Sequence, residues 1–333
     1  MKYYHPSLNT ISESQSNWSI PLGFSEGEQA QTENTAFING VQHYWDSTSI
    51  GLFKTCGRKY NWSLVQGYAP RTMPPPLAFG IHLHTLLQTW HNLVESGIDK
   101  NTAFMRVTRL AGLLGETLPE GDSARTKETL VRSIVWYLDV YYNDAAKTVR
   151  RADGKAAVEQ HFMLPFLEHK GQTVYICGHL DRLVTWQGQT FCCDYKTTKY
   201  SLDGRFFEQY KPSIQMSLYM VASHLISQQN TDIPTAHGII VDGIQLGTNY
   251  TRFARQIIPY SLEEVDEFIV NLQHWIIQAM DTSQAGIFLP NETACGNYSG
   301  CHFREICSKP PARRQVFLDG NFTKRIWDPT KER

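Results

Sequence analysis

Three consecutive segments in the middle of this chain have the pattern of β-strands. They cover residues 156–167, 172–185 and 189–197. Gln187-Gly188 supplies a tight turn between the second and third segments. We therefore expect these two to form a β-hairpin, and the rest of the chain must fold around it.

Charged residues interrupt the hairpin where a core strand ends. Residues 191–193 predict a buried strand, and Asp194, Tyr195 and Lys196 follow directly. Residues two apart on a strand share a face, so Asp194 and Lys196 project together while Tyr195 points to the other face. The short turn brings Asp181, on the preceding strand, alongside them.

This set of side chains predicts a site for a divalent cation. Two carboxylates that converge are costly unless a cation lies between them, and Mg²⁺ prefers such oxygen ligands. A water bound to the metal becomes acidic enough to attack phosphorus, and a nearby lysine can orient it or offset negative charge. The alternative is a surface hairpin with one salt bridge between Asp194 and Lys196.

Helical segments surround these strands on both sides in the sequence. We expect helices before them at 77–96, 101–115 and 123–148, and after them at 212–228 and 261–280. Two more strands are expected at 236–244 and 250–258. The pattern indicates an α/β protein with a central sheet flanked by helices.

The 333 residues suit one large α/β domain with insertions, or two domains that share a core. Residues 1–43 are polar and lack periodicity, so we expect a loosely ordered arm. The main domain should span 44–310, with a compact cysteine-containing loop at 290–310. A basic tail should occupy 311–333.

Composition excludes several classes of protein. No apolar run reaches about 18 residues and no signal peptide is evident, so we expect no membrane span and a cytoplasmic location. The sequence has no G-x-x-x-x-G-K-[ST] phosphate loop, so no helicase motor is expected within it. The net charge of −1 argues against extensive non-specific electrostatic binding to DNA.

The seven cysteines favour metal ligation over disulfide bonds, because their number is odd and no export signal accompanies them. Cys295, Cys301 and Cys307 lie within thirteen residues, close enough to reach one metal centre. A closed site needs a fourth ligand, and Cys56 is the candidate. The remaining three cysteines fall in predicted core strands, where a buried thiol behaves as a small hydrophobe.

Several motifs, in order along residues 45 to 310, resemble those of RecB-type nucleases in the PD-(D/E)XK superfamily, which includes the CRISPR adaptation exonucleases and many phage enzymes. Gly178-x-x-Asp181-Arg182 followed by Asp194-Tyr195-Lys196-Thr197 resembles the central signature. The other landmarks are the G-x-x-x-H helix start ending at His84, an acidic residue at Glu159 and the Q-x-x-x-Y motif of Gln215 and Tyr219. This resemblance implies a restriction-endonuclease-like fold with a central mixed β-sheet.

The resemblance also implies a role for each residue. His84, Asp181, Asp194 and the carbonyl of Tyr195 would hold Mg²⁺ or Mn²⁺, and Lys196 would be the catalytic lysine. Glu159 would bind a second ion or pair with a basic residue. Gln215 and Tyr219 would contact DNA or support the lysine, unless they only belong to an amphipathic helix, and Arg182 would support the same region.

The cysteines resemble those of the iron–sulfur members of this family, in which one cysteine lies far upstream of three others. The resemblance implies a [4Fe–4S] cluster on Cys56, Cys295, Cys301 and Cys307, with zinc or no metal as the alternatives. Gly57 stands where the family has proline, and the first C-terminal spacing is five residues rather than two. A cluster would join the two ends of the domain and stabilise the fold.

The implied activity is hydrolysis of DNA by an exonuclease or flap-type nuclease, on single strands or ends, in recombination, repair, phage DNA processing or CRISPR adaptation. Basic and aromatic residues interleave over 199–212, which suits a single strand but equally an ordinary loop with buried rings. The alternatives are a non-catalytic DNA-binding scaffold for a helicase, recombinase or integrase, and a zinc-stabilised interaction protein. A homo-oligomer is compatible with the resemblance.

Overall fold

The computed structural model describes residues 35–229, 233–297 and 300–331. Its centre is a seven-stranded sheet in which β10, β9, β8, β7 and β3 follow in this order, while β5 and β6 also pair with β7. The strands are β3 (Tyr44–Trp45), β5 (Lys147–Thr148), β6 (Val158–His169), β7 (Gln172–Trp186), β8 (Gln189–Thr198), β9 (Gly238–Leu246) and β10 (Thr251–Pro259).

The sheet is mixed, as the sequence predicted. Strands β6, β7 and β8 form an antiparallel series with short turns, and β9 pairs with β10 in the same way. Strand β9 is parallel to β8, and the chain crosses over between them through α6 (Gly204–Glu208) and α7 (Ile214–Gln229). The predicted α/β class, with a central mixed sheet flanked by helices, is confirmed.

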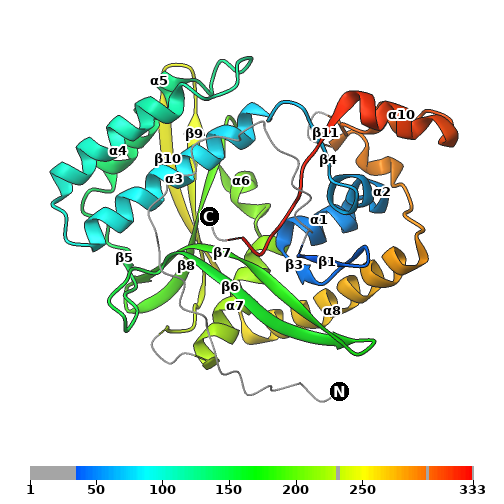
Figure 1. Cartoon of the computed structure of the whole chain (residues 1–333). Coiled ribbons are helices and arrows are strands. Elements are labelled where there is room, and N and C mark those ends of the chain that lie inside the picture. The colour runs from blue at the N-terminus through cyan, green and yellow to red at the C-terminus, as the bar shows by residue number, and fades with distance from the viewer. Residues whose placement is uncertain (1–34, 230–232, 298–299, 332–333) are drawn as a thin grey trace.

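Three helices cover one face of the sheet and form one side of the molecule (Figure 1). They are α3 (Pro75–Glu95), α4 (Lys100–Gly115) and α5 (Lys127–Val140). Leu83 and Leu87 of α3 and Ile134 of α5 are fully buried in one cluster with Val184 of β7 and Ile240 of β9. Burial of each such side chain contributes roughly 1.5–3 kcal/mol, so α3 is held firmly on the sheet.

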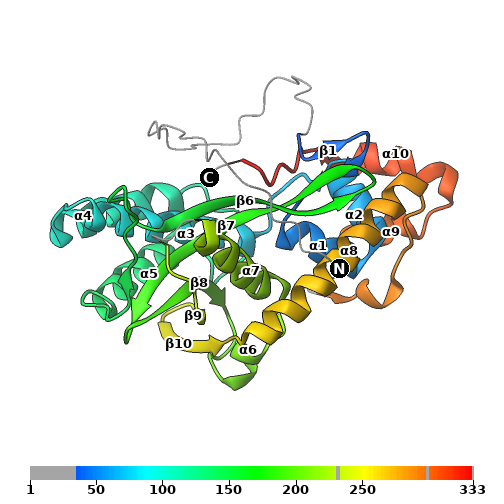
Figure 2. The same ribbon diagram turned by 90° about the horizontal axis from the view of Figure 1, so that it is seen from below.

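The opposite face is covered by α7 and by the long helix α8 (Leu262–Ala285), as Figure 2 shows from below. Helix α7 is buried from Met216 to Ser223, which makes it a core helix of the sheet. Helix α8 begins at the capping box of Ser261 and Glu264 that the sequence predicted.

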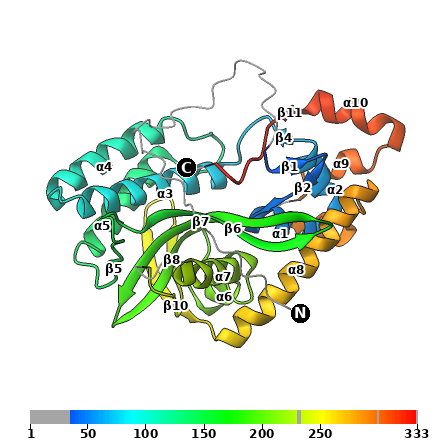
Figure 3. The same cartoon turned by 60° about the horizontal axis from the view of Figure 1, so that its bottom comes forward.

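Segments from the N-terminal and C-terminal parts of the described chain lie side by side on the side of the molecule away from α4 (Figure 3). Strand β11 (Phe322–Lys324) pairs with β4 (Tyr68–Pro70), and a small core there includes Trp62, Phe303 and Leu318. The helices and helical turns of this region are α1 (Ser47–Thr55), α2 (Gly57–Tyr60), a π-helical turn (Asn61–Val65), a 3₁₀ turn (Glu292–Ala294), α9 (Arg304–Cys307) and α10 (Pro311–Asn321).

Three boundaries differ from the expectations. The helix predicted at 123–148 begins at Lys127, after the cap of Thr126, and ends at Val140; the turn that follows is closed by Asp144, which accepts from the Ala146 amide. Residues 35–43 carry β1 (Phe37–Ile38) and β2 (Val41–Gln42), while 1–34 lie outside the described residues.

The segment expected to be a separate basic tail is packed onto the domain over 311–331. Lys324 donates to the carbonyl of Gln66, the Arg325 amide donates to Gly67, and Trp327 packs against the main core. Among the described helices, none combines the length and the apolar character needed to cross a membrane.

Candidate active site

The predicted carboxylates lie at a fork between two strands of the sheet. Strands β7 and β8 pair from their turn as far as Arg182 opposite Cys193. Beyond this pair β7 continues beside β6, and β8 continues beside β9. Asp181 and Asp194 are the first residues past the last pair, and both are buried. The hairpin register that the sequence predicted therefore brings the two carboxylates together.

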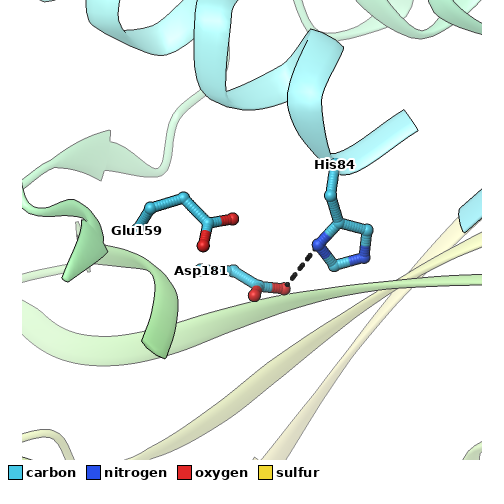
Figure 4. Close-up of side chains that lie close together, drawn as sticks. All are labelled: His84, Glu159 and Asp181. Atoms are coloured by element: carbon cyan, nitrogen blue, oxygen red, sulfur yellow. Dashed lines mark ion pairs between the residues drawn. The ribbon is translucent and has the colours of Figure 1, made fainter. Parts of the chain in front are cut away.

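Helix α3 places His84 in this fork (Figure 4). Its Nδ1 atom lies 3.3 Å from Oδ2 of Asp181, and its Nε2 atom lies 2.9 Å from the carbonyl oxygen of Tyr195. The amide of Tyr195 donates to Oδ2 of Asp181 at 3.3 Å. One imidazole thus contacts both strands of the fork.

Glu159 completes a group of three potential metal ligands. It lies on β6 opposite Asp181, where the ladder between β6 and β7 omits one pair. One ligand atom each of His84, Glu159 and Asp181 lies within 4.8 Å of the others. The φ angle of Glu159 is 47°, which costs a residue other than glycine about 1–3 kcal/mol and is common at functional sites.

Lys196 is held between the fork and helix α7. Its Nζ atom lies 2.7 Å from Oδ2 of Asp194 and donates to Oε1 of Gln215 at 2.8 Å. Nε2 of Gln215 in turn donates to the hydroxyl of Tyr219, one helical turn along, at 2.8 Å. Gln215 of the Q-x-x-x-Y motif thus contacts Lys196 directly, and Tyr219 contacts it only through Gln215.

The charged groups in the fork change one another's pKa values. Burial opposes protonation of His84, but the Asp181 carboxylate outweighs it and raises the pKa of His84 to about 9. Burial would raise the pKa of Asp181, yet His84 and Lys196 hold it below its usual value. Burial raises the pKa of Asp194 to about 6, although Lys196 opposes this. Without a metal, a protonated His84 lies between the Asp181 carboxylate and the Tyr195 carbonyl.

The other two histidines of α3 lie away from the fork. Nε2 of His82 is 2.9 Å from the hydroxyl of Thr117, at the surface. Nε2 of His91 is 3.0 Å from the hydroxyl of Tyr195, beneath the helix. Of the three, only His84 reaches the carboxylates.

Arg182 is buried on the face opposite Asp194. Its guanidinium donates to Thr148 and to the carbonyl of Ala146 at 3.0 Å and 2.7 Å, and it pairs with Asp144 at 3.5 Å. Only 3% of the residue is exposed, so Arg182 is not at the surface, where DNA could reach it.

The four candidate cysteines line one pocket, formed by the junction of α1 and α2 with the segment 290–307. The Asn291 amide lies 3.4 Å from the sulfur of Cys56, and a guanidinium nitrogen of Arg58 lies 3.8 Å from the sulfur of Cys307. All four are free and half-buried. The chain brings Cys56 to the three C-terminal cysteines across more than 230 residues.

The sulfur atoms are more widely spaced than the ligands of a single zinc ion. Within the described ranges no three cysteine sulfurs lie within 4.8 Å of one another. A tetrahedral zinc site with Zn–S bonds of about 2.3 Å places its sulfurs roughly 3.8 Å apart. Cys177, Cys192 and Cys193 are buried in the sheet, and burial raises their pKa values, as expected of structural thiols.

The basic and aromatic segment 199–212 does not form a continuous stacking surface. Phe206 and Phe207 are buried in the main core. Lys199 pairs with Asp122 at 2.8 Å and Lys211 with Glu264 at 2.8 Å. The interleaved pattern therefore reflects a short packed helix, while Tyr200 remains 83% exposed.

Sequence reasoning missed a set of polar residues beneath α3. They lie on the face of the sheet to which the Tyr195 side chain points, and they are His91, Tyr137, Asp144, Asp242 and Arg255. The signal was present in β9, because Asp242 is a charged residue inside a strand that is otherwise largely apolar.

A mixed sheet flanked by helices, with carboxylates, a histidine and a lysine in a strand fork, is the architecture of a hydrolase of phosphodiester bonds. The chain belongs to the PD-(D/E)XK nuclease superfamily, whose family model matches residues 47–308. Enzymes of this superfamily use divalent metals. No curated protein matches the chain.

Two solved structures are similar to this chain at low identity. The protein SSO0001 is 13% identical with a TM-score of 0.30, over 72% of this chain and 98% of that one. A candidate exonuclease from Eubacterium rectale is 12% identical with a TM-score of 0.46, over 87% of this chain and 98% of that one.

Proposed function

We propose that this protein is a RecB-type, divalent-metal-dependent deoxyribonuclease that cuts single-stranded DNA or DNA ends. The observation that carries this proposal is the convergence of His84, Asp181, Asp194 and Lys196 in one fork of the sheet. A sheet needs no such buried carboxylates for its stability, since burying charge is costly.

The residues of the fork fit Mg²⁺ or Mn²⁺. The ligands would be His84, Asp181, Asp194 and the carbonyl of Tyr195, with Glu159 close enough to take part or to hold a second ion. Carboxylate and carbonyl oxygens dominate this set, as hard divalent cations require. When bound, the ion lowers the pKa of a coordinated water and offsets the charge that develops on the phosphate.

Lys196 would act on the water and the phosphate. Its Nζ atom is fixed by Asp194 on one side and Gln215 on the other, so it is held in position without substrate. From there the ammonium can orient the attacking water and stabilise the negative transition state. The water loses a proton as its oxygen bonds to phosphorus, the P–O bond to the leaving nucleotide breaks, and the released oxygen takes up a proton, so the number of protons is unchanged.

Exposed apolar side chains near the fork support a substrate with accessible bases. Leu77 and Ile81 precede His84 by seven and three residues on α3, so they lie on nearly the same face, and they are 51% and 44% exposed. Tyr200 follows Lys196 by four residues. Apolar contact of bases with Leu77 and Ile81, and stacking on the Tyr200 ring, require bases that are not enclosed in a duplex, which favours single strands or frayed ends.

A non-catalytic scaffold for a helicase, recombinase or integrase is the second candidate. A scaffold has no use for a lysine anchored between two polar partners beside a carboxylate pair. The intact set therefore favours catalysis, and a partner of this kind or a homo-oligomer would act in addition to it. Such a nuclease would act in recombination, repair, phage DNA processing or CRISPR adaptation, because each of these processes needs DNA to be cut.

The decisive experiment compares the wild type with Lys196→Ala on end-labelled DNA. Both proteins are purified without oxygen and incubated with single-stranded DNA, blunt duplex or RNA, in Mn²⁺ or in EDTA. We expect the wild type to cut single-stranded DNA only with Mn²⁺ and the variant to be at least about 100-fold slower. The positions of the labelled products give the polarity.

Lys199→Ala is the matched control, since this lysine is three residues away and pairs with Asp122 at the surface. Its rate should stay within a factor of two of the wild type. Equal cutting by the wild type and Lys196→Ala would refute the assigned site. DNA binding without any metal-dependent cutting would favour the scaffold.

We further propose that the cysteine pocket holds a [4Fe–4S] cluster in a structural role. The four thiols line one pocket, although no three of their sulfurs lie within 4.8 Å of one another among the described residues. Amide and guanidinium groups lie beside two of the sulfurs, which suits thiolates that carry negative charge.

The content of iron, sulfide and zinc in anaerobically purified protein tests this proposal. We expect about four irons and four sulfides per chain, with visible absorbance that Cys56→Ser abolishes. Cys177→Ala is the control, because this thiol is buried in the sheet outside the pocket. One zinc per chain without iron would establish the zinc alternative, and neither metal would refute both.

A further inference from the structure

Tyr195 connects two parts of the molecule through its main chain and its side chain. Its amide donates to Asp181 and its carbonyl accepts from His84, so its peptide groups contact two of the proposed metal ligands. Its side chain points to the opposite face, where the hydroxyl lies 3.0 Å from Nε2 of His91. Contacts that hold the Tyr195 side chain in place therefore also hold its carbonyl, which is a proposed metal ligand.

The side chain of Tyr195 belongs to a row of polar residues that crosses the sheet. Tyr195 of β8 lies opposite Asp242 of β9, which lies opposite Arg255 of β10. The Arg255 guanidinium contacts Asp242 at 2.5 Å and Asp144 at 2.9 Å. The Tyr137 hydroxyl donates to the same Asp242 oxygen at 2.6 Å.

Arg182 closes this network beside the fork. Its guanidinium pairs with Asp144 at 3.5 Å and lies near enough to Tyr195 to oppose the rise that burial causes in the pKa of that phenol. Two carboxylates, Asp144 and Asp242, thus face two guanidiniums, Arg182 and Arg255, and the charges balance. Burial, assisted by both arginines, lowers the pKa of His91 well below its ordinary value, so His91 is neutral.

A network of this kind is a costly way to build a core. Buried ion pairs are often no more stabilising than well-packed apolar residues of the same volume, but they restrict the groups that they join to one arrangement. The neighbouring positions of the same face, such as Val184, Ile240 and Ile244, are apolar. The polar residues are concentrated in the row that ends at Tyr195.

We propose that His91, Arg182 and the Tyr195 side chain are positioning residues of the metal site, which set the location of the Tyr195 peptide between Asp181 and His84. This inference rests on the proposed function, because it assumes a metal in the fork. The side chains act through the main chain of Tyr195, since none of them faces the fork. Outer residues of this kind typically change metal affinity 10- to 100-fold when they are replaced.

Binding of Mn²⁺, measured from the electron paramagnetic resonance of the free ion, tests this directly without any need for cleavage. Asp181→Asn defines the binding that belongs to the fork. Tyr195→Phe and His91→Leu should weaken that binding about tenfold. His91→Gln retains a group that can hydrogen-bond the Tyr195 hydroxyl, so it should restore most of the affinity that His91→Leu loses.

Leu130→Ala is the control for a general loss of stability, since Leu130 is fully buried in the same cluster and its apolar side chain cannot hydrogen-bond to the network. It should lower the unfolding temperature at least as much as His91→Leu and leave Mn²⁺ affinity within twofold of the wild type. Equal Mn²⁺ affinity in the wild type, Tyr195→Phe and His91→Leu would overturn the inference. So would equal losses in His91→Leu and His91→Gln, or in Leu130→Ala.

The two proposals fail in different ways. Absence of Asp181-dependent Mn²⁺ binding in the wild type would refute the metal site and therefore the proposed function. Binding and cleavage by the wild type, with unaltered affinity in the variants, would refute the positioning role alone.

Discussion

The Nζ atom of Lys196 lies 2.8 Å from Oε1 of Gln215, a residue that α7 brings to the fork from the opposite face of the sheet. Gln215 is itself oriented by the hydroxyl of Tyr219. The lysine, which the hairpin carries, is therefore also held by Gln215, which lies outside the hairpin. Since Gln215 belongs to the crossover between β8 and β9, this crossover is part of the site.

Loss of this contact should slow cleavage without abolishing it. A hydrogen bond to a charged group contributes about 1.5–3 kcal/mol, so Gln215→Ala should lower kcat by roughly 10- to 100-fold and affect KM less. Gln228→Ala is the control on the same helix, since Gln228 contacts only His224 among the hydrogen bonds described for its side chain. A kcat for Gln215→Ala equal to that of the wild type would show that Asp194 alone positions the lysine.

Stability without metal should depend on pH through His84. Its folded pKa of about 9 lies above its ordinary value of 6.5, so the folded state binds the proton more tightly. This contribution is complete below pH 6.5 and is lost as the pH rises through 9. In EDTA, the unfolding temperature of the wild type should therefore fall between pH 6.5 and 9.

His84→Gln should remove most of that slope, because glutamine does not titrate. Differential scanning calorimetry of both proteins at several pH values in EDTA measures the difference. An equal slope in the two proteins would mean that other groups cause the pH dependence. Saturating Mn²⁺ should reverse the trend for the wild type, because the metal competes with the proton for His84.

The parts of the fold that the sequence predicted are those set by local periodicity. Strands β6, β7 and β8 were placed within about three residues of their ends, and the hairpin register followed from the turn at residues 187–188. The site followed as well, because Asp181, Asp194 and Lys196 belong to one hairpin. His84, Glu159, Gln215 and Tyr219 were singled out only by the resemblance. For His84, nothing local distinguishes it from His82 and His91.

The polar row beneath α3 could not be predicted in the same way. Asp144 and Arg255 are 111 residues apart, and their pairing depends on the order of the strands in the folded sheet. Charged residues inside apolar strands indicate buried partners, but the sequence does not say which. The predicted end of α5 was wrong as well: the helix ends at Val140, and Asp144 lies in the turn beyond it, where it pairs with Arg182 and Arg255.

Tyr200 should contribute to binding of single-stranded DNA. It is 83% exposed, the highest value among the large hydrophobic side chains described, and it follows the strand that carries Lys196. Stacking of one base contributes about 1–3 kcal/mol, so Tyr200→Ala should weaken binding of a labelled oligonucleotide about tenfold by fluorescence anisotropy in EDTA.

Tyr200→Phe keeps the ring and should bind within twofold of the wild type. Blunt duplex should lose much less affinity than the single strand in Tyr200→Ala. Similar losses for both kinds of DNA would show that the side chain contacts the backbone rather than a base.

Removal of the cluster should loosen the junction of the chain ends. Cys56 and Cys307 are far apart in the sequence, and closing such a loop stabilises a fold by about 2–4 kcal/mol in the chain-entropy picture. Cys56→Ser should therefore lower the unfolding temperature by roughly 5–10 °C relative to the wild type. Stripping the wild type with a chelator should produce the same decrease, and it should have no further effect on Cys56→Ser. The chelator could instead remove the metal without lowering the unfolding temperature of the wild type. That result would show that packing around Trp62, Phe303 and Leu318 is sufficient to hold the two segments together.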